Sequence, residues 1–519
     1  MSAPDTRLSN PVIYEVYPRS FLDTTGSGEG DLRGITERLS YIRDLGVDAI
    51  WIAPFYASPM VDGGYDIVNH RSVDPRFGTL SDFDALIAKA DDMGLAVLVD
   101  MVFNHTSDQH PWFQSALSGD EDAARRYVWR DAKPDGSPPN NWQSFIGPPA
   151  WKWHPRRGQY YFHQYLQEQP SLDLRNPEVQ EDQKKTIHFW KDRGVRGFRF
   201  DVVTAYLFDQ SLKDNPPAAE EVRAHIDGPD ARPYSYQDHV YDMLPGDGAE
   251  YAEKLRQWAG EDAWLVGECN TGNQSLAIAQ DFSAAGRLDA VYTTDIVECA
   301  SNPAAYERIF ETLDGNWCVP WWFSSHDQAR ATSRHGRGDH SATARFLAAV
   351  LCVMPGPLIL YQGEELGLPQ PHLDPEEIQD PFDAYFWPEG PGRSGPRMPL
   401  PWEETRPGFG FTAAKPWMPM RWPPGVSVHT QLDEDGSVLG FYRQMLALRK
   451  EHGFAAPQEL HIAVDDGLMK LRIEAEGSFT ALFNFGEKAK DIEVDGTPIL
   501  KTGYADGALA PQGALITQG

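Results

Sequence analysis

With 519 residues, of which 24% are charged and 41% hydrophobic, the chain has the composition of a globular protein of two or three domains. Its 46 basic residues are outnumbered by 76 acidic ones, and the formal charge of −30 disfavours binding to nucleic acid or to anionic membranes. Neither is therefore expected as a partner.

Short apolar runs alternate with amphipathic stretches along most of the chain. The alternation predicts strands followed by helices, and eight such repeats are typical of a closed (β/α)₈ barrel. The predicted strands are 12–17, 49–53, 96–100, 197–201, 264–268, 288–292, 319–323 and 357–361. The clearest predicted helices between them are 35–45, 80–93, 179–193 and 251–259.

Two intervals break this rhythm. The segment 105–175 is rich in Trp, Pro, Gly and Asn and predicts a subdomain inserted after the third strand, between barrel parts 1–104 and 176–453. The segment 366–424 predicts a long functional loop at the barrel mouth, before a closing helix at 438–450. From 454 to 519, alternating apolar and polar residues predict a C-terminal antiparallel β domain.

The compartment is predicted from what the chain does not contain. The N-terminus has no basic region followed by an apolar one, and no apolar run approaches the roughly 18 residues of a membrane span. The 4 cysteines show no metal-binding spacing and read as free, buried thiols. Together these features predict a cytoplasmic protein.

Three acids stand at the ends of apolar runs. Asp201 closes a Gly-Phe-Arg-Phe-Asp run, Glu268 lies in Gly-Glu-Cys, and Asp327 ends Ser-His-Asp; an Asp-Met-Val-Phe-Asn-His block precedes them at 100–105. In a (β/α)₈ barrel these ends share one face, where catalytic groups sit. A nucleophilic carboxylate and a protonated acid about 5–5.5 Å apart are typical of retaining glycoside hydrolysis. Arg199 lies on the strand face of Asp201 and would keep it ionised, but the sequence leaves open which acid holds the proton.

The four blocks, in this order, resemble those of the α-amylase superfamily (glycoside hydrolase family 13), and the resemblance covers nearly the whole chain. Within the superfamily the chain is most similar to the exo-acting α-glucosidase and oligo-1,6-glucosidase group. The residues that carry this similarity are Gly64-Tyr65-Asp66, Gln169-Pro170-Ser171-Leu172-Asp173, Gln362-Gly363-Glu364-Glu365-Leu366-Gly367 and Arg397-Met398-Pro399-Leu400-Pro401-Trp402.

The resemblance implies a role for each matching residue. Asp201 matches the nucleophile, Glu268 the general acid/base, and Asp327 the acid that stabilises the transition state through sugar hydroxyls. The other matches contact or enclose the glucose at subsite −1. They are His105 and His326, Arg199 beside the nucleophile, Asp62, Tyr65 and Arg397 at the closed end of the pocket, and Phe145 and Tyr165 as aromatic lining.

The resemblance also points to a metal loop at 23–31, with one departure. The family usually reads Asp-x-Asn-x-Asp-Gly-x-Gly-Asp; here Asp23 and Asp31 remain, whereas Thr25 and Ser27 replace the Asn and the middle Asp. A hard cation prefers several charged oxygen ligands. A structural Ca²⁺ or Mg²⁺ is therefore expected to bind weakly if at all, and the chemistry itself requires no cofactor.

The expected function is a retaining exo-acting α-glucosidase that releases glucose from the non-reducing end of short α-glucosides, with transglucosylation. The alternative is a glucosyltransferase or isomerase of the same fold, such as a trehalose synthase; a remote alternative is a non-catalytic scaffold. For linkage the signals conflict. Val202 is typical of α-1,6-preferring relatives, whereas 214–217 and 233–239 resemble α-glucosidases that take α-1,4-linked substrates, so a broad disaccharidase is expected.

Overall fold

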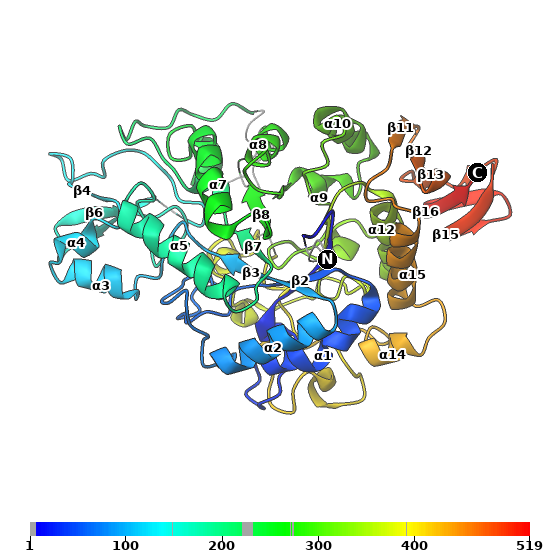
Figure 1. Ribbon diagram of the computed structural model, residues 1–519, viewed down its shortest axis with the longest axis horizontal. Coiled ribbons are helices and arrows are strands. Elements are labelled where there is room, and N and C mark those ends of the chain that lie inside the picture. The colour runs from blue at the N-terminus through cyan, green and yellow to red at the C-terminus, as the bar shows by residue number, and fades with distance from the viewer. Residues whose placement is uncertain (1–6, 148, 221–231, 270, 272–273, 391) are drawn as a thin grey trace, which may run out of the picture.

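The computed structural model describes residues 7–147, 149–220, 232–269, 271, 274–390 and 392–519. Its centre is a curled parallel sheet with the strand order β10-β1-β2-β3-β7-β8-β9, with helices around it (Figure 1). Burial on both faces explains why these strands read as apolar runs. The strands are β1 Val12–Val16, β2 Ala49–Ile52, β3 Ala96–Met101, β7 Gly197–Phe200, β8 Trp264–Cys269, β9 Ala290–Thr293 and β10 Leu358–Tyr361.

The prediction of a strand at 319–323 is wrong, because this segment does not form a regular strand. In its place Trp321 forms a single parallel bridge with Leu358. On the other side, the Val291 N–H donates to the Cys318 carbonyl at 3.0 Å. Pro320 has no N–H to give to a ladder, which limits pairing here to isolated bonds. The segment still bridges β9 and β10, in keeping with the predicted barrel.

The helices around the barrel confirm the predicted helices, and α1 and α2 begin at residues whose side chains cap the helix N-terminus. The Asp31 carboxylate accepts the Gly34 N–H and starts α1 three residues before the predicted start, and Thr79 and Asp82 form a capping box on α2. The longer helices are α1 Leu32–Leu45, α2 Leu80–Asp92, α5 Pro177–Lys191, α7 Pro245–Ala259, α8 Ser275–Phe282, α10 Pro303–Leu313, α12 His340–Val353 and α15 Val438–Glu451.

Between β3 and α5 the chain forms the insertion, with a three-stranded sheet in the order β4-β6-β5. It lies at the opposite end of the molecule from the C-terminal sheet (Figure 1). Its aromatic residues pack on one another; Trp142, for example, lies 5.3 Å from Phe162 between ring centroids. The elements are α3 Pro111–Leu117, α4 Glu121–Ala124, β4 Trp129–Arg130, β5 Trp151–His154 and β6 Gln159–Phe162.

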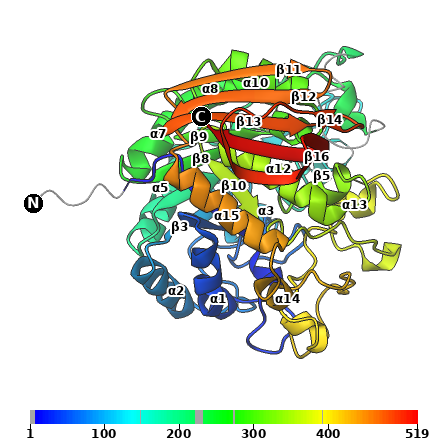
Figure 2. The same cartoon turned by 90° about the vertical axis from the view of Figure 1, so that its right-hand side faces the viewer.

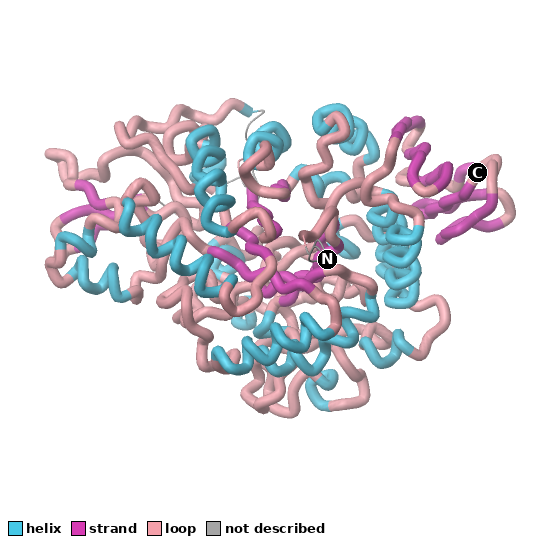
Figure 3. The backbone as a smooth tube through the Cα atoms, viewed as in Figure 1, coloured by secondary structure: helices cyan, strands magenta, loops and turns pink. Residues whose placement is uncertain are grey.

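The long segment 366–424 contains only short helices, and Figure 3 shows how much loop (pink) surrounds the regular elements. Trp402 anchors its end, because the indole packs against the rings of Phe21 and Tyr41 at 5.2 Å each. Besides those of the insertion, the short helices among the described residues are η1 Pro18–Ser20, η2 Val203–Ala205, η3 Pro233–Tyr236, α9 Asp295–Cys299, α11 Ala331–Arg334, η4 Pro375–Glu377, α13 Pro381–Tyr385, η5 Pro407–Gly410 and α14 Val428–Leu432.

The C-terminal part is an antiparallel sheet, as predicted, with the order β11-β12-β13-β16-β14 and with β15 paired to β16. It lies beside α12 and α15 (Figure 2), and Phe346 of α12 packs on Phe485 at 4.9 Å between ring centroids. The strands are β11 Glu459–Asp465, β12 Leu468–Ala475, β13 Gly477–Asn484, β14 Lys490–Asp491, β15 Thr497–Ala505 and β16 Ala508–Gln518. None of the helices in the described part of the chain has the length and apolar content that a bilayer crossing requires.

A buried arginine connects the last barrel helix to the last barrel strand. Arg449 of α15 is 3% exposed, and its guanidinium donates to backbone carbonyls at the end of α12, including those of Cys352 (3.2 Å) and Gly356 (2.5 Å). The carbonyls in the last turn of α12 have no N–H partner within the helix, and Gly356 lies in the turn that follows it. Arg449 therefore fixes the turn that leads into β10.

Replacing Arg449 with Met should lower the free energy of unfolding by about 2–4 kcal/mol, because several buried carbonyls lose their donor. Guanidinium chloride denaturation followed by circular dichroism measures the change. The control is Lys450→Met on the same helix; the Lys450 side chain is 75% exposed and pairs with Asp48 at 3.2 Å, so its loss should change stability by less than about 1 kcal/mol. Equal effects of the two substitutions would contradict the assigned role of Arg449.

Candidate active site

The predicted catalytic acids lie at the carboxyl ends of neighbouring strands. Asp201 directly follows β7, Glu268 is the penultimate residue of β8, and β7 pairs with β8 in parallel register. Both side chains are nearly buried, with Asp201 6% and Glu268 7% exposed. Parallel pairing sets the two acids side by side at one rim of the barrel.

Arg199 of β7 connects the acids of this rim. Its guanidinium donates from Nη1 to Asp100 at 2.8 Å and to Asp201 at 2.5 Å, and from Nη2 to Glu268 at 2.5 Å. Its Nε donates to the Tyr292 hydroxyl at 2.9 Å. Since Arg199 is 1% exposed, these partners replace water completely.

The charges around Arg199 do not balance if every acid is ionised. One guanidinium faces the three carboxylates of Asp100, Asp201 and Glu268. Burial raises the pKa of Asp201 well above its usual range; Arg199 lowers it, and Glu268 and Asp100 raise it further. Burial likewise raises the pKa of Asp100. Contrary to the expectation from the sequence, Arg199 does not outweigh these effects at Asp201, and the excess of negative charge favours a proton shared within the cluster.

The residue after Asp201 fixes Glu268 through its backbone. Val202 has φ 41°, in the left-handed region that β-branched residues rarely adopt. Its N–H donates to Glu268 Oε2 at 3.1 Å, the same oxygen that Arg199 contacts. Two donors on Oε2 hold the Glu268 carboxyl group in one orientation. The strained backbone therefore serves to orient the acid.

His326 and Tyr65 form a second buried chain beside Arg199. The Tyr65 hydroxyl lies 3.1 Å from Asp100 Oδ2 and 2.7 Å from His326 Nε2, and the two rings stack 5.3 Å apart. His326 Nδ1 lies 2.5 Å from Glu15 Oε1. The sequence did not single out Glu15. It lies 311 positions away on β1, and no local motif marks it.

Asp327 is held by two arginines, although only Arg397 was predicted. Its Oδ1 lies 2.6 Å from Arg397 Nη2 and 2.9 Å from Arg393 Nη2. Burial raises the pKa of Asp327, but Arg393, His326 and Arg397 together bring it well below the usual range. Asp327 is therefore ionised at every pH at which the protein would work.

A fully buried acid, Asp380, positions both arginines. Asp380 Oδ2 lies 3.2 Å from Arg393 Nε and 3.0 Å from Arg397 Nη1. Its Oδ1 caps α13, accepting the N–H groups of Phe382 and Asp383 at 3.0 Å each. In the sequence, Asp380 before a proline indicates only a helix cap, and Arg393 lies in an irregular loop. Neither residue could be identified without the long-range contacts.

Asp62 extends the group formed by Asp327, Asp380, Arg393 and Arg397, which we call the charged wall, and His105 lies beside it. Asp62 Oδ2 accepts from the Gln169 amide at 2.8 Å, and its Oδ1 lies 3.7 Å from Arg393 Nη2. Burial lowers the pKa of His105 to about 3, and its Nε2 lies 3.2 Å from the Tyr65 carbonyl. His105 is therefore a neutral imidazole, which can donate to or accept from a sugar hydroxyl without adding charge.

Phe145 and Tyr165 of the insertion lie beside Val202, the residue after Asp201. Their ring centroids are 5.9 Å apart, and both pack on the buried cluster that contains Val202 and Tyr234. This side of the site is aromatic, in contrast to the charged side around Asp327. All eleven predicted catalytic and sugar-binding residues are thus linked, through these contacts, to one rim of the barrel.

The predicted metal residues form a loop that is closed by its own hydrogen bonds. Asp23 Oδ1 accepts the N–H groups of Thr25 (2.9 Å) and Gly26 (2.8 Å), and Oδ2 accepts from Gly28 N–H (2.8 Å) and the Thr412 hydroxyl (2.6 Å). The Ser27 hydroxyl donates to the Glu29 carbonyl at 3.0 Å.

The Asp31 carboxylate is engaged in the same way, since it accepts hydrogen bonds from the backbone N–H groups of Gly34 and Thr24. The donors cover the lone pairs that a cation would need, so this arrangement does not fit a Ca²⁺ or Mg²⁺ ion. Within the described ranges, no three or more His, Cys, Asp or Glu side chains come together in a way that would hold a metal ion.

Removing divalent cations should therefore leave stability unchanged. Dialysis against EDTA, followed by calorimetry with and without added Ca²⁺ or Mg²⁺, should give the same Tm, because a ligand that does not bind the native state cannot stabilise it. A rise in Tm on adding either ion that Asp23→Asn abolishes would show that the loop opens to accept a metal.

Comparison with known proteins shows the family of this chain. The α-amylase catalytic-domain family matches residues 15–456. A probable α-glucosidase of Rhizobium meliloti is 43% identical over 500 residues, which cover 93% of this chain and 90% of that protein. An oligo-1,6-glucosidase of Parageobacillus thermoglucosidasius is 30% identical, with 95% and 92% covered.

Solved structures show the same similarity over the whole chain. An α-glucosyl transfer enzyme superposes with a TM-score of 0.91 at 37% identity, covering 98% of this chain and 99% of that one. The trehalulose synthase of Pseudomonas mesoacidophila superposes with a TM-score of 0.86 at 28% identity, and both chains are covered completely (100%). The chain therefore belongs to the α-amylase family of glycoside hydrolases.

Proposed function

We propose that this protein is a retaining exo-acting α-glucosidase that releases glucose from the non-reducing end of short α-glucosides. The observation that carries the proposal is the cluster in which one buried guanidinium, that of Arg199, contacts both Asp201 and Glu268. The relatives named α-glucosidase and oligo-1,6-glucosidase support the substrate class.

In the first step Asp201 acts as the nucleophile. One of its carboxylate oxygens attacks the anomeric carbon, and the bond from that carbon to the leaving oxygen breaks. Glu268 gives its proton to the leaving oxygen, and a β-linked glucosyl ester of Asp201 forms. Arg199 stays bound to both carboxylates and keeps the attacking oxygen aimed.

In the second step Glu268 acts as a base. It takes a proton from a water molecule, whose oxygen attacks the anomeric carbon from the face opposite the ester bond. The ester breaks, Asp201 regains its negative charge, and glucose leaves with the α configuration. Two inversions at one carbon restore the original configuration.

The charged wall around Asp327 explains exo action. Asp62, Asp327 and Asp380 surround the guanidinium groups of Arg393 and Arg397, within 2.6–3.7 Å. Carboxylates held this way can accept hydrogen bonds from the hydroxyls of a terminal glucose, and we propose that this network closes the pocket to a longer chain. Asp327 would bind the 2- and 3-hydroxyls as positive charge develops on the sugar ring.

Glucosyl transfer is the second candidate function. Structures of an α-glucosyl transfer enzyme and of a trehalulose synthase cover this chain almost completely. The glucosyl ester reacts with any hydroxyl that reaches it, so the choice between water and a sugar depends on the apolar side formed by Phe145, Tyr165 and Val202. The same groups would set the preference for one glucosidic linkage over another. We propose that this preference is weak and that the enzyme is a broad disaccharidase. Chromatography of the products from maltose separates hydrolysis from transfer.

Asp201→Asn and Glu268→Gln should each lower kcat on maltose by at least about a thousandfold, because each removes a reacting group while nearly preserving shape. The rate of glucose release from maltose measures the loss, and azide should partly restore turnover of p-nitrophenyl α-glucoside by Glu268→Ala. The control is Glu253→Gln, an exposed acid on α7 paired with Arg287, which should retain full activity. A folded Asp201→Asn protein with a tenth of normal activity would overturn the assignment.

The first product should be α-glucose, since the mechanism inverts the anomeric carbon twice. Proton NMR during the first minutes of maltotriose hydrolysis should show α-glucose and maltose before mutarotation. Initial β-glucose would indicate a single inversion. Products longer than glucose released early from starch would indicate an open cleft instead of a closed pocket.

Arg393→Lys should lower kcat/KM on maltose by about 10–100-fold, because a lysine cannot contact Asp62, Asp327 and Asp380 together. Since the wall binds the sugar in both ground and transition states, KM should rise along with any fall in kcat. The control is Arg421→Lys in the same long loop, where Arg421 is 47% exposed and pairs with Glu377. Unchanged kinetics for Arg393→Lys would exclude Arg393 from the pocket wall.

A further inference from the structure

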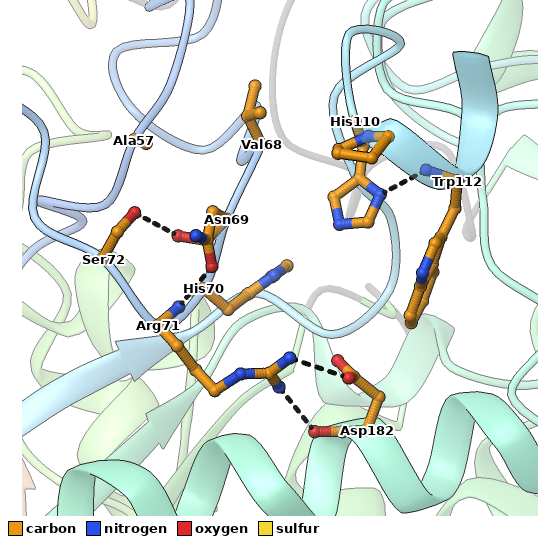
Figure 4. A pocket seen from close by; sticks show the side chains of 10 residues that line it. Ala57, Val68, Asn69, His70, Arg71, Ser72, His110, Trp112 and Asp182 are labelled. Carbon is orange, nitrogen blue, oxygen red and sulfur yellow. Dashed lines mark hydrogen bonds and ion pairs between the residues drawn. The ribbon is translucent and has the colours of Figure 1, made fainter. Parts of the chain in front are cut away.

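A second cavity of about 460 Å³ lies outside the site described above (Figure 4). It lies between the loop after β2, the start of α3 and the side of α5. Its principal lining side chains are His70, Arg71, His110, Trp112 and Asp182, and we refer to it as the His110 cavity. Its volume is in the range of sites that bind small molecules, about 300–1,000 Å³.

The His110 cavity is connected through the backbone to residues of the candidate active site. The loop that carries Tyr65 in the active site continues to His70 in the cavity, and the segment that carries His105 continues to His110. These two segments are joined where the Ser107 N–H donates to the Ile67 carbonyl at 2.9 Å. Two short stretches of backbone therefore separate the two sites.

The cavity has no net charge. Arg71 Nη2 lies 2.9 Å from Asp182 Oδ1, so the one cation and the one anion among the lining residues neutralise each other. Burial lowers the pKa of His110 to about 3 and also lowers the pKa of His70. Both imidazoles are therefore neutral, and the ligand that fits best carries no charge.

The hydrogen bonds fix what each imidazole offers. His110 Nδ1 accepts a hydrogen bond from the backbone N–H of Trp112 at 3.1 Å, so the proton of the neutral His110 ring must be on Nε2. His70 Nε2 lies 2.8 Å from the Val102 carbonyl, which can only accept, so Nδ1 is the acceptor of His70. One ring offers a donor and the other an acceptor, a pair that suits a hydroxyl group. The carboxylate of Asp182 adds a second acceptor.

An aromatic ring with a fixed position completes the cavity. Trp112 packs against the His110 ring at 4.9 Å between centroids, and the guanidinium of Arg126 covers it at 4.7 Å. Figure 4 shows His110 and Trp112 on one side of the cavity, Asn69 and Ser72 on the other, and Asp182 below. A ring beside a few convergent polar groups is typical of sites for small polar ligands.

We propose that the His110 cavity is a second binding site, for a neutral polyol the size of a monosaccharide. A hexose offers vicinal hydroxyls to His70, His110 and Asp182 and an apolar ring face to Trp112. Glucose is the natural probe because it is the product of the proposed reaction, but the site itself does not depend on that function.

The experiment follows the indole N–H signal of Trp112 by NMR, assigned by its loss in Trp112→Phe. Adding glucose should shift this signal saturably, with a Kd of about 1–10 mM, the range expected for so small a ligand. His110→Asn keeps a capping side chain for α3 but loses the Nε2 donor. This variant and Asp182→Asn should each raise the Kd about tenfold or more, the effect of one lost hydrogen bond.

The matched control is Asp84→Asn, which removes a carboxylate paired with Arg193 at 2.8 Å, outside the cavity; its Kd should be unchanged. A shift that does not saturate would overturn the proposal. A saturable shift that both cavity variants retain would also overturn it, because glucose would then act from another place, such as the catalytic pocket. The signal reports on the cavity whether or not the protein is an α-glucosidase.

Discussion

The site depends on one interaction, the contact of the buried Arg199 guanidinium with Asp100, Asp201 and Glu268. A single positive charge among three carboxylates favours one proton shared within the group, next to an ionised acid. Retaining hydrolysis requires these two states at the same time. The parallel pairing of β3, β7 and β8 brings the four residues together, and the left-handed backbone of Val202 adds a donor that orients Glu268.

The opposite side of the pocket uses the reverse arrangement, with acids distributed around two arginines. Asp380 lies beneath Arg393 and Arg397, and the arginines in turn hold Asp327 ionised. Buried charges of this kind are costly unless each has a partner. Here the partners form a continuous network, which gives the wall a rigid shape. A rigid wall of charged groups suits the recognition of a single terminal sugar better than the passage of a polymer.

The sequence was sufficient where a function rests on a local pattern. Asp201 and Glu268 could be identified because an apolar run that stops at an acid is visible in five residues, and Arg199 because side chains two apart share a strand face. Prediction from the sequence failed where the two contacting residues are far apart in the chain or where the backbone is irregular. Glu15 meets His326 across 311 positions, and Asp380 meets Arg393 within a loop that has no periodicity. The strand expected at 319–323 is broken because Pro320 has no backbone N–H to donate. Whether the Asp23 carboxylate faces a cation or the N–H groups of its own loop depends on the loop conformation, which composition does not determine.

The most direct test of the account is to trap the glucosyl ester. An α-glucosyl fluoride with a second fluorine on its ring forms the ester faster than it is hydrolysed, and mass spectrometry of a proteolytic digest then locates the sugar. The account predicts one adduct per chain, on the peptide that contains Asp201, formed at the rate at which activity is lost. An adduct on Glu268 or Asp327, or loss of activity without any adduct, would contradict it.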